Sequence, residues 1–324
     1  MPLTFDFPLD KCRKYQGTNP RPADFDAYWD RAMEEMHAVM PDVAMERAEF
    51  RARGVECFHL SFTGVGGARV HAKFLRPEKN NGPHPAIIMF HGYSMDSGDW
   101  SDKLAYVSQG FTVAALDVRG QGGLSQDHSV VGGTTLHGHI IRGLDDAVRG
   151  EPDKLLFRQV FLDAAELTEI VMDMPDVDAD HVGVTGWSQG GGLTVACAAL
   201  VPRIARAAPV YPFLSDYQRV WEMDMAKDAY QELRDYFRRA NPLHANGNSV
   251  FEALGYIDIQ HLAPRIRSEV LWSTGLMDEI CPPSSQFAAY NKISAKKRMD
   301  IYPDFGHEGI KGAGDRIFAF LSDI

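Results

Sequence analysis

The chain has 324 residues, of which 45% are hydrophobic and 24% are charged, and its formal net charge is −11. These proportions are typical of a globular protein large enough to bury a substantial core. The acidic balance, 33 lysines and arginines against 44 aspartates and glutamates, disfavours binding to the phosphate backbone of nucleic acid.

Residues 1–50 are expected to form a helical extension. Their large apolar side chains recur at helical spacing and would lie on one helix face: Phe25, Tyr28, Trp29 and Met33. This spacing favours packing over ligand binding. The first residues contain no basic segment followed by an apolar core, so we expect no secretion signal.

The cysteines and the hydropathy pattern indicate the compartment. Four cysteines are spread widely along the chain: Cys12, Cys57, Cys197 and Cys281. Without a secretion signal, we expect reduced thiols rather than disulfides. No run approaches the roughly 20 apolar residues needed to span a bilayer. The sequence therefore predicts a cytoplasmic protein with no membrane contact.

The chain then alternates between strand-like and helical segments. The pattern over 58–75 predicts an antiparallel hairpin with a glycine-rich turn at 64–67. Apolar strand-like runs follow at 86–90, 111–117, 181–186, 208–212, 269–274 and 298–303. This alternation predicts an α/β fold, with a mostly parallel sheet covered by helices on both faces, in a single domain spanning 1–324. The charged, aromatic-rich stretch 214–262 is expected to be a helical insertion, either a cap or an oligomer contact.

The pentapeptide Gly186-Trp187-Ser188-Gln189-Gly190 matches G-x-S-x-G, the nucleophile elbow of serine hydrolases. A strand-like run precedes it, and a helix of small residues follows at 191–200. Glycines on both sides of the serine allow neighbouring backbones to approach closely. The alternative is a glycine-rich turn in which Ser188 is only a helix N-cap.

A serine nucleophile needs a base, and the base needs an orienting acid. His307 follows the last predicted strand, and Asp278 follows the strand before it. Asp278 lies 90 residues after Ser188 (278−188) and 29 before His307 (307−278), which is the chain order of α/β-hydrolases. Glu279 and Asp304 are rival acids. A surface role is the alternative for His307.

An oxyanion hole requires two N–H donors. The residue after the nucleophile, Gln189, supplies one candidate, and Tyr93, after the strand at 86–90, supplies the other. His137-Gly138-His139 is weak as a metal motif, and no paired-cysteine spacing occurs. We therefore expect neither a metal nor a cofactor.

With these residues identified, the chain resembles the carbohydrate esterase family of acetyl xylan esterases and cephalosporin C deacetylases. Three signatures of that family occur in order: Arg119-Gly120-Gln121, Gly186-Trp187-Ser188-Gln189-Gly190 and His307-Glu308. Segment 275–291 is similar to the family's aspartate segment. Trp187 stands where the family often has a small residue, and Ser94 stands where an asparagine is common.

The resemblance implies an α/β-hydrolase fold with Ser188 as nucleophile, His307 as base and Asp278 as the acid that orients it. The N–H groups of Tyr93 and Gln189 would bind the oxyanion. Three further residues would be structural groups near the site: Arg119, Gln121 and Glu308. The family also implies a homo-oligomer, a hexamer built from dimers.

These observations predict a serine esterase that removes acetyl groups from small or oligomeric sugars, xylo-oligosaccharides above all, and that also accepts cephalosporin C. Two alternatives remain open. One is a serine peptidase of the prolyl-oligopeptidase type, which shares the elbow and the order of the triad. The other is a hydrolase-fold binding protein without catalytic activity.

Overall fold

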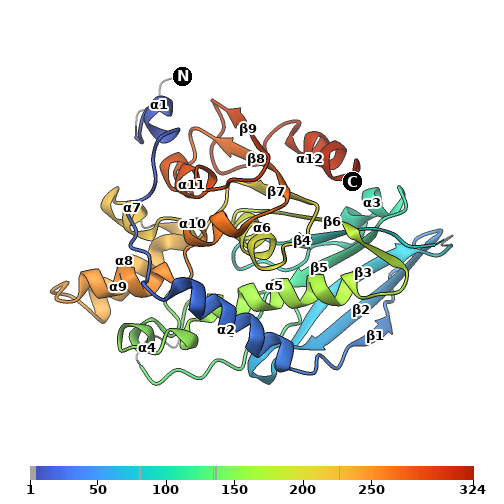
Figure 1. Cartoon of the computed structure of the whole chain (residues 1–324), viewed down its shortest axis with the longest axis horizontal. Helices are drawn as coiled ribbons and strands as arrows, with labels where there is room; N and C mark the ends of the chain where they lie inside the picture. Colours follow the sequence, from blue (N-terminus) through green and yellow to red (C-terminus); the bar gives the residue numbers. More distant parts are fainter. Residues whose placement is uncertain (1–4, 80–81, 134, 136, 226) are drawn as a thin grey trace.

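A sheet of nine strands runs through the centre of the computed structural model, which describes residues 5–79, 82–133, 135, 137–225 and 227–324 (Figure 1). In chain order the strands are β1 (Ala44–Arg47), β2 (Val55–Thr63), β3 (Arg69–Pro77), β4 (His84–Phe90), β5 (Thr112–Asp117), β6 (Val177–Trp187), β7 (Arg206–Val210), β8 (Glu269–Gly275) and β9 (Lys297–Tyr302). Across the sheet their order is β1-β2-β3-β5-β4-β6-β7-β8-β9.

Two parts of the sheet differ in direction. Strands β1, β2 and β3 are antiparallel, and β3 is also antiparallel to β5. All other neighbouring strands, from β5 across to β9, pair in parallel. The mostly parallel sheet is thus confirmed. Its geometry places the loops after β4, β6, β8 and β9 at one edge, where α/β proteins bind their ligands.

Helices cover both faces of this sheet. The α-helices are α1 (Leu9–Cys12), α2 (Phe25–Ala38), α3 (Leu104–Val107), α4 (Leu144–Val148), α5 (Leu156–Met172), α6 (Gln189–Leu200), α7 (Tyr217–Glu222), α8 (Gln231–Arg239), α9 (Gly247–Gly255), α10 (Ile259–Leu262), α11 (Pro283–Tyr290) and α12 (Ala313–Leu321). The 3₁₀ turns are η1 (Val65–Gly67), η2 (Trp100–Lys103), η3 (Pro152–Lys154), η4 (Asp228–Tyr230) and η5 (Ala263–Arg265).

The two faces form two separate cores. On one face α5 and α6 pack against the sheet, and α2 packs against α5 (Figure 1). On the other face α3 and α12 cover a smaller apolar cluster. Helix α6 is buried along its whole length and consists of glycine, alanine and other small or apolar residues. These small side chains allow α6 to lie close to β6 and β7, which fixes the position of its first turn.

One expectation needs correction. Residues 1–50 contain the expected apolar helix, α2, but they end in a strand rather than in a helix. Strand β1 pairs with β2 at the sheet edge, Ala44 opposite Ser61 and Arg47 opposite Phe58. All four β1 residues are exposed, so β1 has no apolar alternation by which to recognise it. Hydrogen bonding to a free strand edge, not burial, selects the extended conformation.

Segment 214–262 is helical, as expected, and comprises α7 to α10. A buried carboxylate at its start joins it to the N-terminal segment: Asp216 accepts hydrogen bonds from the Tyr15 hydroxyl at 2.7 Å and from the Asn19 amide at 2.8 Å. Among the described residues, no helix combines the length and the apolar character that crossing a bilayer requires.

Candidate active site

Ser188 lies between the end of β6 and the start of α6 in a strained backbone conformation, with φ 58° and ψ −117°. The turn depends on glycine. A Cβ on Gly190 would lie 2.1 Å from the Phe90 carbonyl oxygen, and one on Gly186 would lie 2.6 Å from the same atom. Ser188 occupies the N-cap position of α6, yet its side chain makes no capping hydrogen bond. The N-cap alternative therefore does not describe its role.

The structure brings Ser188, His307 and Asp278 together. His307 Nε2 lies 2.9 Å from Ser188 Oγ, and His307 Nδ1 lies 3.0 Å from Asp278 Oδ2. The second oxygen of Asp278 accepts the amide hydrogens of Ile280 at 2.9 Å and Cys281 at 2.8 Å. Asp278 is fully buried and the His307 side chain is 17% exposed. The acid is thus held rigidly while the imidazole faces the pocket.

The turn after β8 and the loop after β9 are joined by backbone hydrogen bonds. Met277 donates its amide hydrogen to the Phe305 carbonyl at 2.9 Å. A Cβ on Gly275 would lie 2.3 Å from that same oxygen, so the glycine permits the close approach. The hydrogen bond between these two loops keeps Asp278 close to His307. The rival acids lie elsewhere: Glu279 pairs with Lys227, and Asp304 is exposed.

The two expected oxyanion donors lie beside Ser188. Gln189 begins α6 and is buried, and Tyr93 follows β4. Neither backbone N–H has an acceptor among the described residues. Gln121 links the two segments that carry these donors. Its side-chain amide exchanges two hydrogen bonds with that of Gln189, at 2.7 and 3.0 Å, and its Oε1 also accepts the backbone N–H of Ser94, which follows Tyr93, at 2.9 Å.

Arg119 and Glu308 make structural contacts. Arg119 is buried and forms a fork with Asp163, at 2.6 and 2.5 Å, and it also donates to the Val65 carbonyl at 3.1 Å. Glu308 accepts the Gly306 amide hydrogen with its side chain at 3.1 Å. Neither residue lines the pocket around Ser188.

Sequence reasoning missed Tyr211, which directly follows β7. Its ring lies 4.5 Å from the His307 ring, centroid to centroid, and its hydroxyl donates to the Glu308 carbonyl at 3.0 Å. Tyr211 has a φ of 30°, a value that a tyrosine adopts only under constraint. Trp187 packs edge-on against Tyr211 at 5.5 Å. No local pattern marks Tyr211, because its partner lies 97 residues away.

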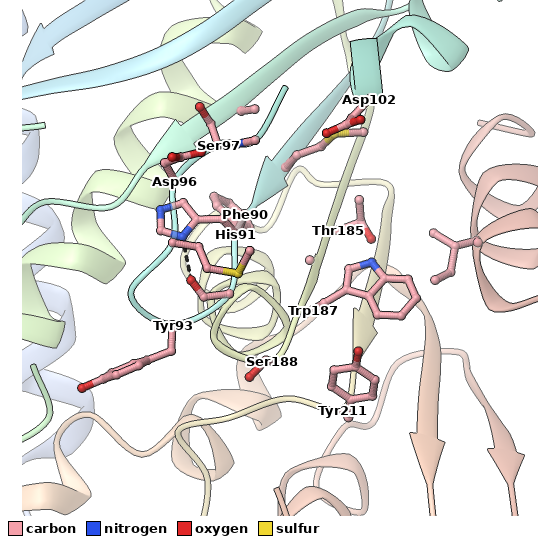
Figure 2. A pocket seen from close by; sticks show the side chains of 18 of the residues that line it. Phe90, His91, Tyr93, Asp96, Ser97, Asp102, Thr185, Trp187, Ser188 and Tyr211 are labelled. Atoms are coloured by element: carbon pink, nitrogen blue, oxygen red, sulfur yellow. Dashed lines mark hydrogen bonds between the residues drawn. The ribbon is translucent and has the colours of Figure 1, made fainter. Parts of the chain in front are cut away.

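A cavity of about 740 Å³ opens at Ser188 and His307. Ser188 lies between Tyr93 on one side and Trp187 and Tyr211 on the other (Figure 2). Much of the lining is apolar and aromatic, and carboxylates are added by Asp96, Asp102 and Asp228. The third of these belongs to segment 214–262, so the insertion forms part of the pocket wall.

Only one group of potential metal ligands is found among the described residues: Asp278, Cys281 and His307, whose ligand atoms lie within 4.8 Å of one another. The histidine nitrogens already bind Ser188 and Asp278. Cys281 is fully buried, and burial raises the pKa of its thiol well above the usual value. The hydrogen bonds of a serine–histidine–aspartate relay account for this cluster.

A serine on a strand-to-helix turn, with its histidine and aspartate on later loops of the same sheet edge, defines the α/β-hydrolase fold class. The model of the acetyl xylan esterase family AXE1 matches residues 1–324. The chain belongs to this acetyl xylan esterase family.

Individual relatives support this assignment. Acetyl xylan esterase 1 of Thermoanaerobacterium sp. JW/SL YS485 is 57% identical, with a TM-score of 0.95 over 98% of this chain and 99% of that one. The acetyl xylan esterase of Paenibacillus sp. R4 is 31% identical, with a TM-score of 0.92 and the same coverage. Acetyl esterase Axe7A of Xylanibacter ruminicola is 24% identical over 288 residues, which are 87% of this chain and 62% of that protein's length.

Proposed function

We propose that this protein is a serine esterase that hydrolyses acetyl esters of small and oligomeric sugars through an acyl-enzyme on Ser188. The observation that carries the proposal is the unbroken relay from Asp278 through His307 to Ser188, with both links near 3 Å. The family match supports ester hydrolysis over the peptidase and binding-protein alternatives.

In the first step Ser188 Oγ attacks the acetyl carbonyl carbon while its proton moves to His307 Nε2. The carbonyl oxygen becomes an oxyanion and accepts the N–H groups of Tyr93 and Gln189. The C–O bond to the alcohol then breaks, and His307 donates its proton to the leaving oxygen. Water repeats the sequence on the acyl-enzyme and releases acetate and free Ser188. Asp278 keeps the imidazole in the required tautomer and stabilises its protonated form.

The cavity supports a sugar ester as substrate. Its volume of about 740 Å³ far exceeds an acetyl group, so it has room for a large alcohol part. Trp187 and Tyr211 offer aromatic surfaces for the apolar face of a sugar ring, and Asp96 and Asp102 offer acceptors for hydroxyl groups. We propose acetylated xylo-oligosaccharides as the main substrates and cephalosporin C as an opportunistic one.

Three further proposals concern the whole protein. The chain is proposed to fold as one α/β-hydrolase domain in which 214–262 is an insertion beside the pocket. A reducing, cytoplasmic location is supported by four free and buried cysteines. Assembly into a homo-oligomer, a hexamer by family resemblance, is tested by sedimentation velocity. A monomer at micromolar concentration would contradict it.

The catalytic proposal is tested with p-nitrophenyl acetate and a fluorophosphonate probe. Ser188→Ala removes the nucleophile, and kcat is expected to fall by about 10⁴- to 10⁶-fold. The probe should label the wild type and leave Ser188→Ala unlabelled. An aminoacyl-proline amide, assayed in parallel, separates an esterase from a peptidase. Near-normal turnover by the variant, or a wild type that the probe does not label, would overturn the assignment.

A further inference from the structure

The Tyr93 side chain does not face the reacting serine. It is directed away from Ser188 (Figure 2). Its ring packs edge-on between Phe213, at 5.7 Å, and His139, at 5.0 Å, and its hydroxyl donates to the carboxylate of Glu232. The side chain is therefore placed to hold the Tyr93 backbone rather than to contact the acyl group.

Glu232 extends this contact to a third segment of the chain. It lies on α8 in the insertion, and its Oε2 accepts the amide hydrogens of His139 at 2.8 Å and Ile141 at 3.2 Å. Gly138 has a φ of +78°, and a Cβ there would lie only 2.6 Å from Oε2. Burial raises the pKa of Glu232 to about 7, while the hydrogen bonds from the His139 and Ile141 amides act to lower it. Both of its oxygens are thus occupied by protein donors.

Two of the other hydrogen bonds that anchor the loop carrying the Tyr93 N–H lie on either side of Tyr93. His91 Nε2 accepts the Val118 amide hydrogen at 2.9 Å, so His91 Nδ1 is the protonated nitrogen and donates to the Gly92 carbonyl. On the other side of Tyr93, the backbone N–H of Ser94 donates to Oε1 of Gln121. These two anchors fix the residues that flank Tyr93 on either side. Tyr93 itself is held by the hydrogen bond to Glu232 and by the edge-on ring contacts with Phe213 and His139.

We propose that Glu232 is a positioning residue that holds the oxyanion-binding N–H of Tyr93 through the Tyr93 hydroxyl. This inference rests on the proposed esterase function. It gives helix α8 a part in catalysis, because α8 supplies the group that orients a donor located after β4.

The size of the effect follows from the demands on an oxyanion donor. Such a donor stabilises the transition state only when it is aimed at the developing negative charge, and a displacement of about 1 Å can cost about 100-fold in rate. Loss of the Tyr93–Glu232 hydrogen bond should therefore lower kcat and change KM little.

The test compares Tyr93→Phe, Glu232→Gln and the double variant with wild type on p-nitrophenyl acetate. Each single variant is expected to lose about 10- to 100-fold in kcat, with KM within about twofold. The double variant should lose no more than the worse single variant, because both changes act on the same Tyr93–Glu232 contact. Affinity for a trifluoromethyl ketone, which forms a tetrahedral adduct with the serine, should fall by the same factor as kcat/KM.

Glu222→Gln is the matched control, because Glu222 is an exposed carboxylate on α7 whose one hydrogen-bond partner within the described part of the chain is Gln218. It should behave as wild type. The proposal is overturned if Tyr93→Phe keeps kcat, if the two losses multiply in the double variant, or if ketone affinity is unchanged. In all of these outcomes a Ser188-dependent wild-type activity leaves the esterase function itself intact.

Discussion

Asp163→Asn tests the structural role of Arg119. The two side chains are 2% and 1% exposed, and the guanidinium fork meets both carboxylate oxygens. Asparagine keeps the shape of the side chain and removes its charge, so the buried Arg119 would lose the charged partner to which it is directly hydrogen-bonded. Breaking a buried pair in this way costs about 3–5 kcal/mol. For 324 residues the entropy of unfolding is about 0.7 kcal/mol/K, so Tm should fall by about 4–7 °C.

Differential scanning calorimetry measures this shift, and turnover of p-nitrophenyl acetate at 25 °C separates stability from catalysis. Since neither residue lines the pocket, kcat of the folded variant should stay within about twofold of wild type. The double variant Arg119→Met/Asp163→Leu removes both charges and should recover most of the lost stability. An unchanged Tm in Asp163→Asn, or a tenfold loss of kcat in the folded protein, would refute the reasoning.

Two further substitutions test the packing around the site. Glu166 is buried, and burial raises its pKa from 4.5 to about 8, so between these values the folded state holds more protons than the unfolded state. The free energy of unfolding of the wild type should therefore fall as pH rises toward 8. In urea titrations, Glu166→Gln should become more stable relative to the wild type as pH increases. A difference in free energy of unfolding that stays constant with pH would contradict this. Gly190→Ala places a methyl group against the Phe90 carbonyl and should destabilise the fold by about 1–3 kcal/mol with a loss of kcat, whereas Gly247→Ala, in open space, should do neither.

The sequence was sufficient for the fold class and for the three residues that form the relay. Ser188 is marked by a local pattern, since the glycines on both sides are required by the Phe90 carbonyl. Asp278 and His307 are found because each lies in the loop that follows a strand. In a parallel sheet the ends of those strands meet at one edge, so position along the chain predicts proximity in space.

Other parts of the site leave no comparable trace in the sequence. Glu232 is one of several charged residues on an amphipathic helix, and nothing local separates it from Asp235. Its role depends on Tyr93, 139 residues away. Strand β1 likewise has no apolar alternation, because all of its residues are exposed. Long-range hydrogen bonds determine both the role of Glu232 and the extended conformation of β1, and residue type and spacing do not reveal these bonds.

Two of the strained residues of the site, Ser188 and Tyr211, are linked by backbone hydrogen bonds. Ser188 donates its amide hydrogen to the Val210 carbonyl, the residue before Tyr211, and its own carbonyl accepts the amide hydrogens of Gly192 and Phe213, each at 3.0 Å. Positive φ values at Ser188 and Tyr211 together cost a few kcal/mol, so they persist only where surrounding contacts determine them fully. Because the same hydrogen bonds link the turn at Ser188 to the turn at Tyr211, which packs against His307, neither turn can relax alone. The strain is therefore a consequence of holding Ser188 and His307 in one fixed geometry.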